Sequence, residues 1–260
     1  MFALIGGHIN RIEVKNKIER HLIELTKKEC PNILFCPLAS KDAISSINKF
    51  KRQMGNLNYN LSILDFNSID KFDELLASAD IFYIGGGVSD DLINIFKEKG
   101  LDKVLYNHLN DDKVFAGSSA GAMLYTYASM GDKYMFYDNF HHYNYKMVNC
   151  LNFLNITICP HYQNEDLVIY NDELKKYKMD AFGIEEDTMV VIDNNSFYCI
   201  KEEGKLGVYY FSYDDNYLMI PLKEGKVYEK VCGFRSKGDL LWYCVKKLFK
   251  KWKSYGRILS

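Results

Sequence analysis

The chain has 260 residues, of which 48% are hydrophobic and 26% charged, and its formal net charge is −1. Such a length and composition are ordinary for a globular protein with one large domain or two small ones. A net charge near zero gives no general attraction to nucleic acid, so we expect no nucleic-acid partner. The charge is unevenly spread, because residues 233–260 hold eight Lys and Arg against one Asp.

The cysteines and the hydropathy pattern favour a cytoplasmic protein. Seven cysteines are present, an odd number, and no Cys-x-x-Cys motif occurs, which suits reduced thiols better than a disulfide framework. The first seven residues contain too short an apolar run for a signal peptide, and no stretch of about 18 apolar residues exists to span a membrane. No spacing of His, Cys and Asp resembles a metal site, so we expect neither a metal nor another cofactor.

Short apolar runs alternate with segments of helical periodicity over the first two thirds of the chain. The expected strands cover residues 2–5, 32–38, 61–64, 81–84, 114–116, 155–159 and 181–184. The expected helices cover residues 10–29, 43–54, 69–77, 89–108 with a break near Gly100, and 165–179. The alternation predicts an α/β fold with a parallel sheet covered by helices on both faces, and ligands bind such sheets at the carboxyl ends of the strands.

The last third of the chain has a different pattern. From residue 189 onward, the runs 190–192, 196–200 and 205–211 are separated by turn residues and predict antiparallel hairpins. We therefore divide the chain into a domain at 1–232 and a basic extension at 233–260.

Within the extension, residues 238–253 predict an amphipathic helix. Its apolar face holds Leu241, Val245, Leu248 and Trp252, and five lysines lie on the other side. We expect the apolar face to pack on the chain's own domain, because that domain is acidic. A second copy of the chain, in a homodimer, and an anionic membrane surface are the alternatives.

The pentapeptide from Gly117 to Gly121 matches the Gly-x-Ser-x-Gly nucleophile elbow, with Ser119 at its centre. An elbow lifts a serine hydroxyl above a sheet at a sharp strand-to-helix turn, and glycines on either side avoid a clash at the crowded apex. Ala120 would place its N–H at a helix N-terminus, where a developing oxyanion is favoured. The alternative is a tight turn without chemistry, since the motif also occurs by chance.

Three further groups follow expected strands and would reach the same edge of the sheet. Gly85-Gly86-Gly87 can bring bare backbone N–H groups to a ligand, His161 can act as a base, and one of the acids at 185–187 can orient it. The remaining histidines fit less well: His8, His21, His108, His141 and His142. The order Ser, His, acid differs from the Ser, acid, His order of α/β-hydrolases.

Taken in order, Gly-Gly-Gly, Gly-x-Ser-Ala-Gly-Ala, Pro-His and Gly-Ile-x-Glu resemble the peptidase E family over about residues 2–215. That family includes aspartyl dipeptidases and, more distantly, cyanophycinases. The resemblance implies a fold like the class I glutamine amidotransferases and a Ser-His-Glu triad. By motif, the nucleophile is Ser119, the base His161 and the acid Glu186, with Glu185 as the alternative acid. The same resemblance implies that the backbone N–H groups of Gly87 and Ala120 bind the oxyanion, with Gly86 beside them at the substrate.

The resemblance therefore predicts a serine peptidase that cleaves short peptides or related amides through an acyl-enzyme. Val88 stands where aspartyl dipeptidases have asparagine, and segment 125–150 is unlike theirs, so aspartate specificity is not implied. Two other functions stay open. One is a catalytically silent metabolite-binding protein on the same fold. The other is an amidase or esterase that acts on non-peptide acyl groups.

Overall fold

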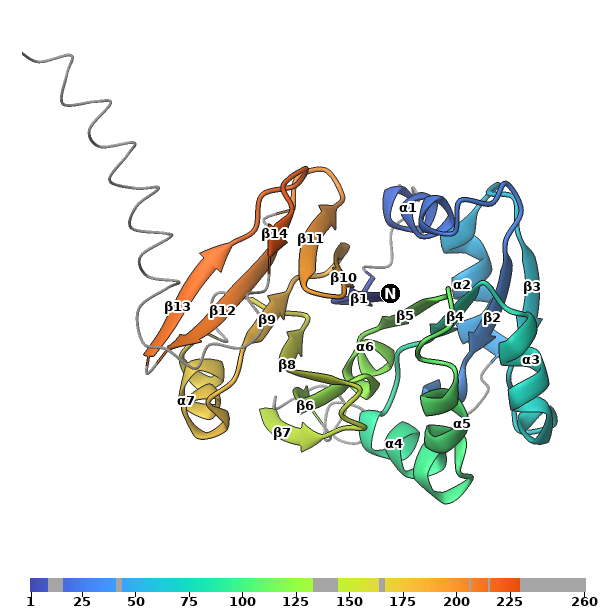
Figure 1. Ribbon diagram of the computed structural model, residues 1–260, viewed down its shortest axis with the longest axis horizontal. Coiled ribbons are helices and arrows are strands. Elements are labelled where there is room, and N and C mark those ends of the chain that lie inside the picture. The colour runs from blue at the N-terminus through green and yellow to red at the C-terminus, as the bar shows by residue number, and fades with distance from the viewer. Residues whose placement is uncertain are drawn as a thin grey trace, which may run out of the picture.

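Figure 1 shows the computed structural model, which describes residues 1–8, 16–40, 44–132, 145–163, 167–205, 207–214 and 216–229. The predicted helix at 238–253 and the whole extension lie outside these ranges, as do His141 and His142. The helix and the domain boundary at residue 232 therefore stay predictions.

The larger sheet has eight strands in the described part of the chain, in the order β14-β11-β10-β1-β5-β4-β2-β3. The five strands from β1 to β3 in this order run parallel. They are β1 (Phe2–Ile5), β5 (Val114–Ser118), β4 (Ile81–Ile84), β2 (Asn32–Cys36) and β3 (Asn60–Ile63). The other three are antiparallel: β10 (Thr188–Asp193), β11 (Ser196–Lys201) and β14 (Tyr228–Glu229).

Helices cover both faces of this sheet, as the sequence predicts (Figure 1). On one face, Ile5 and Phe35 share a core with the apolar sides of α1 (Lys17–Leu25) and α2 (Ile44–Met54). The alternate residues, such as Leu4 and Leu34, face the other side, because successive side chains on a strand point in opposite directions. The helices on that side are α3 (Phe72–Ser78), α4 (Ser89–Glu98), α5 (Leu101–Asn107) and α6 (Ala120–Leu124).

A second sheet of six described strands, in the order β13-β12-β9-β8-β6-β7, packs beside the first. Its strands are β6 (Thr126–Asp132), β7 (Tyr145–Asn149), β8 (Leu154–Pro160), β9 (Ala181–Ile184), β12 (Val208–Asp214) and β13 (Asn216–Pro221). Phe182 and Tyr210 of this sheet contact the ring of Phe197 on β11, so the two sheets share a core. Helix α7 (Leu167–Tyr177) covers the opposite face.

The second sheet adds to the predicted fold, because the sequence analysis did not say how the strands divide between sheets. The expected strands at 155–159 and 181–184 belong to the second sheet as β8 and β9, beside β6 and β7, which the sequence analysis did not identify. The run at 205–211 is β12, and it pairs with β9 and β13 instead of β11. The break in helix 89–108 is at Gly100, whose φ of 67° is left-handed.

Candidate active site

Ser119 lies at the turn between β5 and α6, with φ 52° and ψ −116°. This left-handed backbone is unusual for a residue with a side chain and is the strained geometry expected at a nucleophile elbow. A Cβ on Gly117 would collide with the backbone of Gly121, and one on Gly121 would collide with the carbonyl of Ile84. Both glycines of the motif are therefore required by close backbone approach.

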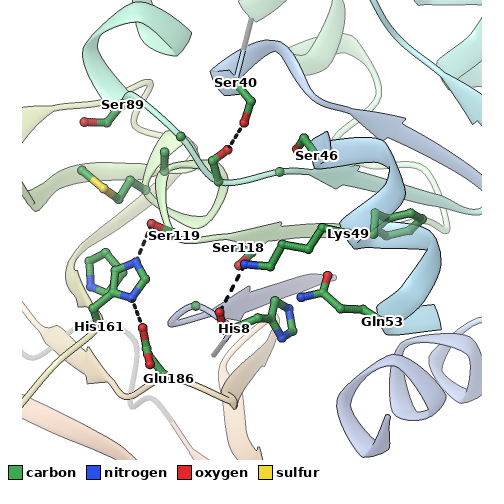
Figure 2. A pocket seen from close by; sticks show the side chains of 18 of the residues that line it. His8, Ser40, Ser46, Lys49, Gln53, Ser89, Ser118, Ser119, His161 and Glu186 are labelled. Atoms are coloured by element: carbon green, nitrogen blue, oxygen red, sulfur yellow. Dashed lines mark hydrogen bonds and ion pairs between the residues drawn. The ribbon is translucent and has the colours of Figure 1, made fainter. Parts of the chain in front are cut away.

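The Ser119 hydroxyl meets an imidazole that comes from the other sheet. His161 follows β8, and its Nε2 lies 2.8 Å from the Ser119 Oγ, while its Nδ1 lies 2.9 Å from Oε1 of Glu186 (Figure 2). Glu186 follows β9, in the turn that leads into β10 of the first sheet. The three residues that the sequence analysis selected are thus brought into one line of hydrogen-bond contacts.

The backbone after β1 holds the imidazole and the acidic turn together. The Gly6 carbonyl accepts the His161 N–H at 3.0 Å, and the Gly7 carbonyl accepts the Asp187 N–H at 2.8 Å. The His161 ring packs directly on Gly7, where a Cβ would overlap its Cε1. Gly7 therefore has to be glycine to let the ring lie where it contacts Ser119.

The neighbouring acids Glu185 and Glu186 point in different directions. Glu185 accepts the Gly207 N–H at 3.1 Å and the Tyr209 hydroxyl at 3.4 Å, away from the imidazole. The hydrogen bond from His161 lowers the pKa of Glu186 below its usual range, although partial burial opposes the shift. Of the two candidate acids, Glu186 is the one in contact with His161.

The glycine loop and the start of α6 lie beside the Ser119 side chain. A Cβ on Gly86 would be 3.3 Å from the Ser119 Cβ, so the backbone passes close to the hydroxyl, and the Gly86 carbonyl accepts a hydrogen bond from Ser40 at 2.8 Å. Gly87 packs against the carbonyl of Ala39. Ala120 is the first residue of α6, where an N–H has no partner within the helix.

Comparison with known proteins identifies the family. The model of peptidase family S51 matches residues 1–200. The chain belongs to peptidase family S51. An S51 chain is a peptide-bond hydrolase of the serine type, and the resemblance to peptidase E is confirmed.

Individual relatives agree with this assignment. The chain is 28% identical over 168 residues to the uncharacterized peptidase YgaJ of Bacillus subtilis strain 168, which covers 64% of this chain and 69% of the relative. A peptidase from an acI-B1 actinobacterium has a similar structure, with a TM-score of 0.62 at 18% identity over 88% of this chain and 96% of its own. A putative peptidase E protein from Listeria monocytogenes EGD-e gives 0.57 at 18% identity, over 78% and 98%.

In this S51 peptidase, Ser119 opens into a pocket of about 530 Å³. Its far wall is formed by α2, from which Ser46, Lys49 and Gln53 project toward the pocket (Figure 2), with Arg52 beside them. Among the described residues that line the pocket, Glu186 alone is acidic. The wall opposite the triad is therefore cationic.

His8 also lines the pocket, and the sequence analysis set it aside. Its Nε2 lies 3.2 Å from the hydroxyl of Tyr83, and its side chain is 9% exposed. Burial, with a smaller effect of Lys49, lowers the pKa of His8 to about 3, so the ring is neutral at ordinary pH. The available signal was its position directly after Gly6-Gly7 at the end of an expected strand.

The described residues also bear on two other kinds of site. Within those ranges, no cluster of three or more His, Cys, Asp or Glu side chains has the geometry to hold a metal ion. No helix there has the length and hydrophobicity needed to cross a bilayer.

Proposed function

We propose that this S51 peptidase hydrolyses short peptides through an acyl-enzyme, with Ser119 as nucleophile, His161 as general base and Glu186 as the acid that orients the imidazole. The observation that carries the proposal is the continuous contact from Ser119 Oγ to His161 Nε2 at 2.8 Å and from Nδ1 to Glu186 at 2.9 Å. Because Nδ1 faces a carboxylate, it carries the ring proton, and Nε2 is left free to accept one.

In the acylation half, His161 Nε2 takes the hydroxyl proton as Ser119 Oγ bonds to the substrate carbonyl carbon. The N–H groups of Gly87 and Ala120 stabilise the oxyanion that forms. Nε2 then gives its proton to the leaving nitrogen as the C–N bond breaks. In the second half, a water molecule gives a proton to Nε2 and attacks the ester carbonyl carbon, and the proton returns to Ser119 Oγ as the C–Oγ bond breaks and the carboxylic acid product leaves.

The charge of the pocket indicates which peptides suit it. Lys49 and Arg52 lie on the wall opposite the triad, and among the described lining residues no acid accompanies them there. A carboxylate on the substrate would be attracted to this wall, because a charge-assisted hydrogen bond is stronger than a neutral one. We therefore propose short peptides that carry a negative charge near the scissile bond.

Replacement of Ser119 tests the proposal. Ser119→Ala should lower peptide turnover by about 10³-fold or more, because a triad nucleophile contributes at least that much to the rate. It should also abolish covalent labelling by a fluorescent fluorophosphonate. Labelling is read on a gel, and turnover is measured with a dipeptide library that includes acidic, neutral and basic members.

Ser46→Ala is the matched control, because Ser46 lines the same pocket from α2 without contacting His161. It should be labelled at the wild-type rate. A folded Ser119→Ala protein that keeps near-full turnover would contradict the mechanism. A wild-type protein that cleaves esters but no member of the peptide library would contradict the substrate class.

A further inference from the structure

A chain of largely buried polar side chains lies beside the triad, and the mechanism above does not use it. Its centre is His8, just after β1, which contacts the Tyr83 hydroxyl through Nε2 at 3.2 Å. On the other side, His8 Nδ1 lies 3.8 Å from Oδ1 of Asp187. Beyond Tyr83, the side chain of Ser118 interacts with the phenol oxygen. All four side chains are largely buried.

The direction of the hydrogen bond between His8 and Tyr83 follows from the protonation of His8. The ring is neutral, and its Nδ1 lies 3.8 Å from the Asp187 carboxylate, which is too far for a direct hydrogen bond but close enough for an electrostatic attraction that favours the proton on Nδ1. Nε2 is then an acceptor, and the Tyr83 hydroxyl donates to it. The remaining neighbour of Nε2 is Glu19, 3.7 Å away, and burial raises the pKa of Glu19 to about 8. At neutral pH, Glu19 therefore carries a proton and no negative charge, so it does not draw the ring proton of His8 to Nε2.

The two ends of this chain lie next to the triad in sequence. Ser118 directly precedes Ser119 on β5, and Asp187 directly follows Glu186 in the turn before β10. Asp187 is further held by Lys205 Nζ at 3.6 Å and, through its N–H, by the Gly7 carbonyl at 2.8 Å. Ser119 and Asp187 both have left-handed backbone, with φ of 52° and 55°. Such conformations persist only where the surroundings hold them.

We propose that Ser118, Tyr83, His8 and Asp187 form a positioning network that fixes the distance between the Ser119 elbow and the Glu186 turn. The inference rests on the proposed triad. None of the four touches the reacting atoms in this assignment. They act through the backbone that adjoins Ser119 and Glu186, the residues that the mechanism uses. The network runs from β5 and β4 of the first sheet to the turn that follows β9 of the second sheet. The His161 side chain spans the same gap, between Ser119 and Glu186.

Removing the central hydroxyl with Tyr83→Phe tests the network in the full-length protein. The probe is the fluorescent fluorophosphonate, whose reaction gives a maximal rate constant, kinact, and a half-saturating concentration, KI. We expect kinact to fall about ten-fold or more, since small misplacements of a reacting group carry large rate penalties. KI should change much less than kinact, because phenylalanine keeps the ring of Tyr83 in the pocket wall and only its hydroxyl is lost.

Tyr125→Phe is the matched control. Tyr125 is also fully buried, and its hydroxyl donates to the Ala116 carbonyl on β5 at 3.0 Å, but it does not line the pocket. Tyr125→Phe removes one buried hydrogen bond to β5, the strand that carries Ser118. The thermal stability of Tyr83→Phe and of Tyr125→Phe should therefore fall, whereas kinact of Tyr125→Phe should stay near the wild-type value. Equal effects of the two substitutions on kinact would overturn the network.

A second variant keeps the proposal testable if Tyr83→Phe fails to fold. His8→Gln retains a donor and an acceptor and should keep more of kinact than His8→Leu. Adding Tyr83→Phe to His8→Leu should lower kinact little further, because the chain is already broken. Full additivity of the two losses would count against a network. If the wild-type protein itself is not labelled, the proposed triad fails and this inference falls with it, whereas normal labelling of every variant overturns the network alone.

Discussion

At the scale of single residues, the turn after β9 assigns different surroundings to two adjacent acids. Glu186 contacts the His161 ring, whereas Glu185 bonds the Gly207 N–H and the Tyr209 hydroxyl. Adjacent residues in an extended segment point to opposite sides, so only one of the pair can reach the imidazole. The geometry makes Glu186 the acid of the proposed triad and Glu185 a structural residue.

We expect Glu186→Gln to lower turnover by about 10²- to 10⁴-fold, because an amide cannot stabilise the imidazolium and favours the wrong tautomer. Glu185→Gln should leave turnover nearly unchanged and lower the melting temperature, since it weakens the contact with Gly207. Steady-state kinetics and thermal denaturation on both variants separate the two roles. The reverse pattern would exchange the assignments of the two acids.

The residues that could be identified from the sequence are those whose chemistry is encoded in local patterns. Ser119 stands within a five-residue motif and His161 directly follows an apolar strand, whereas the pattern left the acids at 185–187 open and the resemblance to peptidase E selected Glu186. His8 follows a strand too, but its partners Tyr83 and Asp187 are 75 and 179 residues away along the chain. No local pattern records such contacts, so the buried network is visible only in the folded chain.

At the scale of elements, α2 forms the pocket wall opposite the triad. Lys49 projects from it toward the pocket, and its Nζ donates to the His8 carbonyl at 3.3 Å (Figure 2). Lys51 is exposed on the same helix and does not line the pocket. The helix therefore offers two lysines that differ in their access to a bound substrate.

We expect Lys49→Met to raise KM for peptides with an acidic residue by about ten-fold, because the free energy of one charge-assisted hydrogen bond corresponds to a change of that order in binding. The effect on neutral peptides should be smaller. Lys51→Met removes the same charge from the same helix and should leave both constants unchanged. Measuring KM for matched acidic and neutral dipeptides tests this. A uniform change across both peptides would argue against a carboxylate at this wall.

The elements themselves were predictable where hydrophobic runs are compact, and the parallel strands around β5 match their expected positions. The second sheet was not predictable, because β6 lies in an aromatic segment with no clear alternation of polar and apolar residues. Pairing is also non-local: β12 is close to β11 in sequence but pairs with β9 and β13. Hydrophobic pattern gives the existence of a strand, whereas the choice of partner depends on the packing of the whole chain.

At the scale of the whole molecule, a buried acid makes stability depend on pH. Glu19 on α1 is 4% exposed, and burial raises its pKa to about 8 from an ordinary value of 4.5, with Glu202 and Asp187 adding to the shift. The folded state therefore holds a proton that the unfolded state releases above pH 4.5. The resulting stability is complete below that pH and is lost as the pH rises to about 8.

We expect Glu19→Gln to remove this dependence. Between pH 6.5 and 8, the wild-type protein should lose roughly 1 kcal/mol of unfolding free energy per pH unit relative to the variant. Below pH 6.5 the neutral His8 opposes the trend, because unfolding lets its ring take up a proton, so the comparison is made above it. Urea denaturation at several pH values measures the difference, and parallel curves for the two proteins would show that Glu19 is ionised when folded.

The position of β1 has a consequence for how the molecule is made. Strand β1 precedes every other described strand in the chain, yet it lies between β5 and β10 in the finished sheet, and its antiparallel partner begins at Thr188. Residues Gly6 and Gly7 at its end carry the backbone contacts to His161 and Asp187. During translation, a chain that ends before Glu185 has the serine elbow but lacks the acidic turn and β10, which is one of the two neighbours of β1. The second neighbour of β1 and the acid of the proposed triad thus enter the chain together, so a nascent chain that ends before them cannot assemble the proposed site.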